Sequence, residues 1–239
     1  MIEALKKQFQ ILFADWYWNP VIIWGSGILG QVLFYIIMRT EMDETTCFAM
    51  GTMFAAIFFV IFTTITAGMS VGIYFNVEIS LGNTRKKFFW TYYIYYVVYF
   101  LIGAVEILVL NIMENHVLTI LYPGLENEIN FVPYLIKFGV PAAIVFPILS
   151  MLFGLAIVKF GTKAFWVLWV IWMFGCLGVP RIIEAVDYTP NSMFGRIGTW
   201  AGKVIMSVPV GVWIGLGAVG FVACLAGSWA IARKQQVTM

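Results

Sequence analysis

Charged residues are scarce in this sequence. Only 11% of its 239 residues are Asp, Glu, Lys or Arg, whereas soluble proteins contain about 25%. Because 62% of the residues are hydrophobic, a soluble fold of this length could not bury all of the apolar surface, and the remainder must face lipid. The sequence therefore predicts an integral protein of the lipid bilayer. Its formal net charge of +2 is too small to indicate a nucleic-acid partner.

Residues that bind metals or act as nucleophiles are also few. His116 is the only histidine, and Cys47, Cys176 and Cys224 lie at or within apolar segments without the spacing of metal ligands. An intramembrane serine protease needs a histidine beside its serine, and an intramembrane metalloprotease needs histidine and acid ligands. Glu106 is the only acid inside an apolar span. We therefore predict neither a metal site nor an enzyme activity in this chain.

A nucleotide-binding loop of the form G-x-x-x-x-G-K-[ST] is missing as well. The nearest approach is Gly202-Lys203, but Val204 follows where the pattern has a hydroxyl, and Ile197 stands in the place of the first glycine. A nucleotide site needs the glycine-rich backbone to cradle the phosphates and the hydroxyl to hold magnesium. We expect this chain to bind no cofactor, so that any ATP and Mg would be bound by another subunit.

Long apolar runs dominate what is present. A helix rises about 1.5 Å per residue, so roughly 20 apolar residues cross the hydrocarbon core of a bilayer. Six runs qualify, of which the fifth is the shortest, and the sixth contains Pro209. The predicted spans are residues 21–38, 48–75, 88–110, 131–158, 164–179 and 204–232. The predicted fold is an all-α integral membrane protein in which residues 1–239 form a single transmembrane domain, a six-helix bundle.

The lysines and arginines predict the orientation of these spans. With six spans both termini share one side, which holds nine of the 14 basic residues: Lys6, Lys7, Arg85, Lys86, Lys87, Lys159, Lys163, Arg233 and Lys234. The other side holds Arg39, Lys137, Arg181, Arg196 and Lys203. The positive-inside rule then places both termini in the cytoplasm. Acids make the outer face negative: Glu41, Asp43, Glu44, Glu114, Glu126, Glu128, Glu184 and Asp187.

The segment before the first span is amphipathic. Apolar residues recur in residues 1–17 at three- and four-residue spacing, with Glu3, Lys6, Lys7 and Gln10 between them. This pattern is typical of a helix that lies in the membrane interface. The alternative is a polar leader without such a helix.

The connection between the second and third spans, residues 76–87, has a distinctive order of residues. Gly82 and Asn83 permit a tight turn, and Thr84 can cap the following helix. Three basic residues follow at once, and Phe88 begins an aromatic run expected to anchor the helix at the interface. Without a resemblance to a known family, these residues favour an ordinary positive-inside loop bordered by aromatic residues.

The string Ile-Ser-Leu-Gly-Asn-Thr-Arg-Lys-Lys-Phe-Phe at this position resembles the cytoplasmic coupling loop of the ABC type-2 exporter permeases. The amphipathic leader, the six spans and the interrupted outer hairpin between spans five and six are similar to that family as well. The sequence-specific part of the resemblance covers about ten residues, while the architecture covers the whole chain.

The resemblance implies a type-2 ABC exporter fold and a permease that pairs with a second permease copy, as a homodimer or heterodimer. Two copies of an ABC ATP-binding subunit, carrying ATP and Mg, would dock on the cytoplasmic side of a bacterial plasma membrane. The residues that would contact the ATPase are Ser80, Leu81, Gly82, Thr84, Arg85, Lys86 and Phe88. The expected cargo is amphipathic or lipid-like, with peptide toxins and antimicrobial peptides favoured.

Two charged residues lie within the predicted spans. Glu106 is about 27 Å along the third span from Phe88, near the outer boundary of the membrane. Lys137 is about one and a half turns into the fourth span, counted from that same outer boundary. They could form a charge pair or line a transport path, because charges within a membrane are costly and often functional. The alternative is that each side chain snorkels to the interface.

A different class of function remains open at this point. A stand-alone membrane immunity or sensor protein would also be apolar and multi-pass, although it would have no reason for a capped basic turn between spans two and three. The aromatic third span also allows two interpretations: a surface along which an amphipathic cargo moves, or an interface belt combined with packing inside the bundle.

Overall fold

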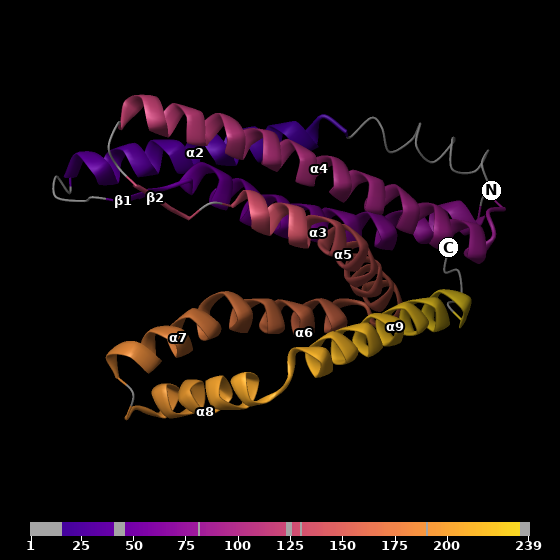
Figure 1. Cartoon of the computed structure of the whole chain (residues 1–239). Coiled ribbons are helices and arrows are strands. Elements are labelled where there is room, and N and C mark those ends of the chain that lie inside the picture. Colours follow the sequence, from indigo (N-terminus) through magenta and orange to yellow (C-terminus); the bar gives the residue numbers. More distant parts are fainter. Residues whose placement is uncertain are drawn as a thin grey trace. The chain divides into compact units, whose positions relative to one another are not determined.

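The computed structural model describes residues 16–40, 46–80, 82–122, 126–129, 131–189 and 191–234. These residues are helical apart from two short strands (Figure 1). In chain order the elements are α2 Trp18–Thr40, β1 Thr46–Phe48, α3 Met50–Ser80, α4 Arg85–Leu121, β2 Glu126–Ile129, α5 Val132–Phe160, α6 Thr162–Met173, the π-helix η2 Phe174–Gly178, α7 Val179–Tyr188, α8 Met193–Ser207 and α9 Val210–Lys234. The predicted amphipathic helix of residues 1–17 falls almost wholly outside the described residues.

Five of the described helices, α2, α3, α4, α5 and α9, are long and apolar enough to cross a membrane. This confirms the prediction of a multi-pass membrane protein. The helices also extend beyond the predicted spans, and α4 is the clearest case. Its 37 residues correspond to about 55 Å, well over the roughly 30 Å of a hydrocarbon core. At least one end of α4 therefore projects out of the apolar layer.

The first span begins earlier than predicted because proline is tolerated at a helix start. The predicted span starts at residue 21, after Pro20, but α2 already begins at Trp18. The first turn of a helix has no partners for its N–H groups, so the missing N–H of Pro20 costs nothing there. The fourth span is also continuous: α5 passes through Pro141 and Pro147.

The fifth predicted span, residues 164–179, is not one uninterrupted α-helix. The regular helix α6 has 12 residues, about 18 Å, which is too short to cross the core by itself. It continues into the five residues of η2 and then into α7. The sequence does not show such a change of helix type, since the apolar pattern runs through it unbroken.

The sixth predicted span, residues 204–232, begins too early. Its first residues belong to α8, which ends at Ser207, and α9 starts at Val210. Pro209 lies in the break, because a proline ring clashes with the preceding turn of a helix. The carbonyl of Pro209 instead accepts from the backbone N–H of Val212 at 2.9 Å. The indole N–H of Trp213 donates across the break to the carbonyl of Ile205 at 3.2 Å.

The contacts group the chain into two compact units, with the boundary between Gly154 and Leu155 inside α5. In the N-terminal unit, α2, α3 and α4 pack against one another (Figure 1). Gly30 lets α2 approach the start of α3: a Cβ at this position would lie 2.7 Å from the carbonyl oxygen of Met50. The strands β1 and β2 pair in parallel beside these helices, with Thr46 opposite Glu126 and Phe48 opposite Ile129.

The aromatic residues of α4 form much of the core of this unit. The ring of Phe59 on α3 lies 5.4 Å from that of Phe100 and 6.4 Å from that of Tyr99. The buried aromatic residues of α4 are Phe88, Phe89, Tyr92, Tyr95, Tyr96, Tyr99 and Phe100. Of the two interpretations of the aromatic span, the structure favours packing inside the bundle.

The C-terminal unit contains a hairpin of two short helices, α7 and α8 (Figure 1). Ser192 caps α8, since its hydroxyl accepts from the N–H of Gly195 at 3.1 Å. Gly198 permits the close approach of the two helices, because a Cβ there would lie 3.1 Å from the carbonyl oxygen of Ile182. This hairpin lies between the fifth and sixth predicted spans and overlaps the ends of both.

Candidate functional site

The connection between α3 and α4 is shorter and more ordered than the predicted loop of residues 76–87. The helix α3 continues to Ser80, and α4 begins at Arg85. Two hydrogen bonds close the end of α3: the N–H of Gly82 donates to the carbonyl of Ile79 at 3.1 Å, and that of Asn83 to the carbonyl of Glu78 at 2.9 Å. Gly82 has φ +89°, which is the pattern of a Schellman motif with glycine in the left-handed conformation.

The side chain of Asn83 reinforces this turn. Its amide N–H donates to Oε2 of Glu78 at 2.7 Å, so the turn residue is tied to the last turns of α3 by both backbone and side chain. Ser80 is similarly occupied within its own helix, because its hydroxyl donates to the carbonyl of Val77 at 2.7 Å. Ser80 therefore belongs to the helix end and not to a loop.

Thr84 caps the next helix as predicted. Its backbone is extended, with φ −82° and ψ 142°, and its hydroxyl accepts from the N–H of Lys87 at 3.3 Å. The carbonyl of Thr84 accepts from the N–H of Phe88 at 2.9 Å. A cap of this kind satisfies an N–H that the helix itself leaves without a partner. Both helix ends that meet at this turn are thus closed by local hydrogen bonds.

The predicted coupling residues divide into exposed and buried groups. Gly82, Thr84 and Lys86 are exposed, as is Lys87, while Arg85 is half-buried. Leu81 lies outside the described residues. These residues form a basic tip supported by two capped helix ends, the α3–α4 turn (residues 82–87).

Phe88 occupies a different environment from the one expected. It is fully buried, with its ring 5.2 Å from that of Phe75 on α3 and 4.3 Å from that of Tyr92. Phe89 is also buried, and only Trp90 of this run is exposed to a substantial degree. Phe88 therefore joins α4 to α3 directly below the α3–α4 turn, and it presents no surface to a docking subunit or to the membrane interface.

The second predicted site, Glu106 with Lys137, is not brought together as an ion pair among the described residues. Oε2 of Glu106 is buried and has no hydrogen-bond partner in that part of the chain. Lys137 is exposed on α5, and its Nζ lies 5.4 Å from the centroid of the Phe138 ring. The exposed Lys137 is compatible with the alternative in which both side chains snorkel to the interface, but the buried Oε2 of Glu106 is not.

Sequence reasoning missed a buried polar cluster centred on Glu114 of α4. This side chain is only 4% exposed, so its assignment to an exposed acidic outer face was wrong. Its carboxylate accepts from the N–H of Gly51 at 2.7 Å and from that of Thr52 at 2.6 Å. The Thr52 hydroxyl donates to the same carboxylate at 2.6 Å, and the Gln31 amide donates to it as well.

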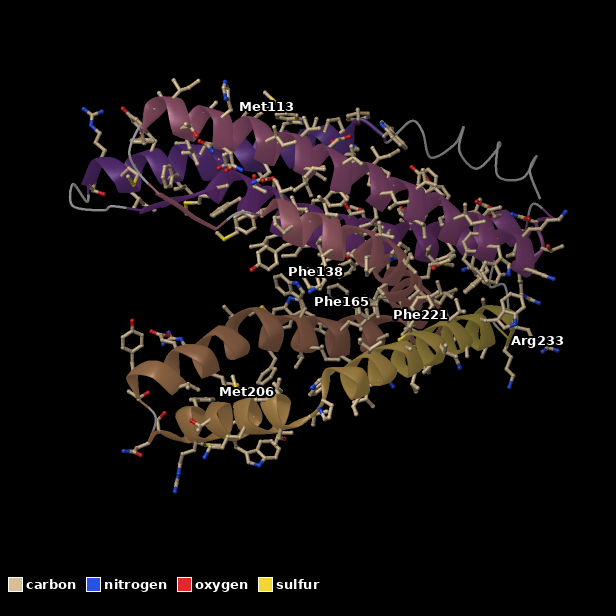
Figure 2. The ribbon with its side chains drawn as sticks, viewed as in Figure 1. Met113, Phe138, Phe165, Met206, Phe221 and Arg233 are labelled. Carbon is tan, nitrogen blue, oxygen red and sulfur yellow. The ribbon has the colours of Figure 1, made fainter. Side chains whose placement is uncertain are left out.

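Two asparagines of α4 complete this Glu114 cluster. The amide of Asn111 donates to the Thr52 hydroxyl at 3.1 Å, and the amide of Asn115 donates to Oδ1 of Asn111 at 3.2 Å. Met113, between them in sequence, points away from the bundle and is 52% exposed (Figure 2). The pattern Asn111, Glu114, Asn115 at spacings of three and four on one helix face was the signal that could have revealed the cluster.

The Glu114 cluster has a structural explanation. Gly51 and Thr52 lie in the first turn of α3, where backbone N–H groups have no partner in the helix and the helix dipole is positive. The Glu114 carboxylate on α4 accepts from both N–H groups. The Gln31 amide on α2 donates to the same carboxylate and so connects α2 to the cluster. The cluster therefore fastens three helices at the end of the bundle remote from the α3–α4 turn, about 43 Å along α4 from Arg85.

Neither the turn nor the cluster supplies a metal centre. Among the residues that the structure describes, no three His, Cys, Asp or Glu side chains are grouped so that they could hold a metal ion. A scan against family models and searches of curated proteins and solved structures found no match to this chain.

Proposed function

We propose that this chain is the membrane-spanning permease subunit of an ATP-driven exporter of the ABC type-2 class. The observation that carries the proposal is the α3–α4 turn, a short connection with hydrogen-bonded caps on both sides and exposed Lys86 and Lys87 at its tip. Caps of this kind are common at helix ends, so the proposal depends on their combination with an exposed basic tip in the connection between these two spans.

The turn is built to transmit a displacement to two helices at once. The Schellman motif fixes the end of α3, and the Thr84 cap fixes the start of α4. The edge-to-face contact between the rings of Phe75 and Phe88 joins the two helices immediately behind the tip, and Tyr92 stacks on Phe88. Because these contacts tie the tip to both spans, a push on the tip would tilt α3 and α4 together.

The partner in this proposal is an ABC ATP-binding subunit, in two copies, that carries ATP and Mg. Positively charged Lys86 and Lys87 would contact acidic side chains in a groove of that subunit, and ATP-driven closure would favour one arrangement of the spans over another. A second permease copy completes the assembly. Both termini then lie in the cytoplasm of a bacterial cell, and the cargo is amphipathic or lipid-like, with peptide toxins favoured.

Co-purification tests the proposal directly. We would express the tagged chain with the ATPase encoded beside its gene, solubilise the membranes in detergent and measure the ATPase retained on the tag. Lys86→Glu/Lys87→Glu should release the ATPase, because both side chains are exposed at the tip. The matched control is Arg233→Glu/Lys234→Glu, which makes the same change of charge at the end of α9 and should retain the ATPase.

Two results would contradict the proposal. If the wild-type chain purifies without any ATPase, the exporter hypothesis fails and the immunity or sensor alternative takes its place. If both charge-reversed variants release the ATPase equally, the association depends on net charge and not on the α3–α4 turn. In that case the coupling role of residues 82–87 is rejected even though the subunit has a partner.

A further inference from the structure

An apolar cavity of about 230 Å³ lies inside the N-terminal unit, between α3, α4 and α5. Its lining includes the rings of Phe59, Phe100, Tyr134 and Phe138 and the small side chains of Ala104 and Ala142. An apolar cavity of about 150 Å³ is large enough to hold a benzene molecule and stays free of water. This cavity is larger, so it has room for a segment of a hydrocarbon chain.

The packing of α5 on α4 keeps the cavity open. Gly139 lies beside α4, where a Cβ would be in ordinary van der Waals contact with the Cβ of Ala104 at 3.5 Å. One to two turns further along α5, the ring of Phe146 stacks on that of Phe100 at 5.8 Å, and the Tyr93 hydroxyl donates to the carbonyl of Ile144 at 3.3 Å. The helices are therefore held at a fixed separation, and the alanines between them are too small to fill it.

The cavity opens at a depth where lipid chains begin. Tyr134 and Phe138 at its mouth are 58% and 53% exposed. The lining residues of α5, from Tyr134 to Ala143, lie about 3–17 Å along the axis from the start of that helix. This is the part of a span next to the headgroups, in the leaflet at the end of the bundle remote from the α3–α4 turn.

A positive charge stands at the mouth of the cavity. Nζ of Lys137 lies 5.4 Å from the centroid of Phe138, one of the lining rings. In the described ranges no carboxylate forms an ion pair with this ammonium, and the side chain is exposed. An apolar chamber with a cation at its rim is complementary to a molecule with one apolar tail and an anionic head.

We propose that the cavity binds one acyl chain of an anionic glycerophospholipid whose phosphate contacts Lys137. A zwitterionic lipid would fill the cavity but would carry a positive group of its own near the ammonium. A cationic amphipathic peptide would be repelled by Lys137. Water is excluded because the lining offers it too few polar partners. This site is independent of the proposed coupling to an ATPase, because it uses α5 and the opposite end of the bundle.

Native mass spectrometry of the full chain tests the lipid site. The chain, purified in detergent, is mixed with phosphatidylglycerol or phosphatidylcholine that carry the same acyl chains, and the retained lipid is counted. The wild type should retain phosphatidylglycerol preferentially. Lys137→Gln should lower the affinity for phosphatidylglycerol about fivefold, which is the effect of one lysine at an anionic surface. The affinity for phosphatidylcholine should not change. Lys137→Arg should restore the preference, and Arg39→Gln, at an exposed cation outside the cavity lining, should not alter it.

Filling the cavity tests the position of the acyl chain. Ala104→Leu and Ala142→Leu each add methyl and methylene groups in the cavity, and each should lower the affinity for both lipids roughly tenfold, the equivalent of about two methylene groups no longer buried. The two variants lie on different helices, and circular dichroism shows whether each one folds. If one variant fails to fold, the other still tests the position of the acyl chain.

Any of three results would overturn the proposal. The first is a wild-type chain that retains the two lipids equally or retains neither, the latter meaning that another part of the chain covers the mouth. The second is a Lys137→Gln variant with undiminished preference. The third is a folded Leu variant that binds both lipids as tightly as the wild type, which would place the acyl chain elsewhere.

Discussion

Replacing Glu114 with alanine should destabilise the protein more than any other removal of a single acid in the described bundle. The change leaves the N–H groups of Gly51 and Thr52 without an acceptor in a buried position. An unsatisfied buried donor costs about 1–3 kcal/mol, and the lost charge at the start of α3 adds roughly 0.3–1 kcal/mol. We therefore expect the free energy of unfolding to fall by about 4 kcal/mol.

Thermal unfolding of the full chain in detergent measures this effect. For a chain of this size about 4 kcal/mol corresponds to a fall in Tm of roughly 8–16 °C. Glu114→Gln should lie between wild type and alanine, because the amide oxygen still accepts from one N–H while the amide nitrogen faces the other donor. The measurement can follow tryptophan fluorescence, and the same samples can be checked for dispersity by size exclusion.

Glu106→Ala is the matched control, since it removes the same side chain about two turns away on the same helix. Oε2 of Glu106 is buried without a hydrogen-bond partner among the described residues, so its removal should leave the Tm unchanged or raise it. The reasoning is refuted if the two alanine variants shift the Tm equally, or if Glu114→Ala stays within about 2 °C of the wild type. Either result would mean that, in the Glu114→Ala variant, water or another side chain accepts hydrogen bonds from the N–H groups at the start of α3.

Three other changes have defined expectations. Thr84→Ala should lower the stability by about 1 kcal/mol through loss of the cap on α4, with Thr84→Ser restoring most of it in the same melting assay. Gly82→Ala should also cost about 1 kcal/mol, because φ +89° is unfavourable for a residue with a Cβ, and hydrogen exchange should show faster opening at the end of α3. Gly30→Val should cost at least about 1–3 kcal/mol by forcing α2 away from α3, whereas Gly25→Ala, with open space around its Cβ position, should be neutral by the same melting measurement.

The membrane class and the first four spans could be predicted from sequence because they depend on local properties. Length and hydropathy of a segment decide whether it can cross a bilayer, and the Gly82-Asn83-Thr84 string contains all the information needed for a helix end followed by a cap. The same approach failed at Pro209, where the apolar run continued across a helix break. It also could not show that the fifth apolar run changes to a π-helix at Phe174.

The candidate site was harder to predict because it depends on which helix faces coincide. Glu114 reads as an ordinary acid at the end of a long apolar helix, and only the start of α3, distant in sequence, explains its burial. The sequence around Phe88 likewise predicts an aromatic residue at the membrane interface. Its burial becomes evident only from its contact with Phe75 on the preceding helix. Lys137 and Glu106 share a predicted depth, yet depth alone does not place two side chains on facing sides of their helices.

The Glu114 cluster imposes an order on synthesis and insertion. The backbone N–H of Thr52 donates to the carboxylate of Glu114, 62 positions later in the chain. The start of α3 therefore has no acceptor when it first leaves the ribosome. At about 5–20 residues per second, translation takes roughly 3–12 s to supply Glu114. During that interval water, or the lining of the insertion machinery, must solvate the exposed N–H groups. The first three spans can therefore close into their final arrangement only after α4 has been made almost to its end.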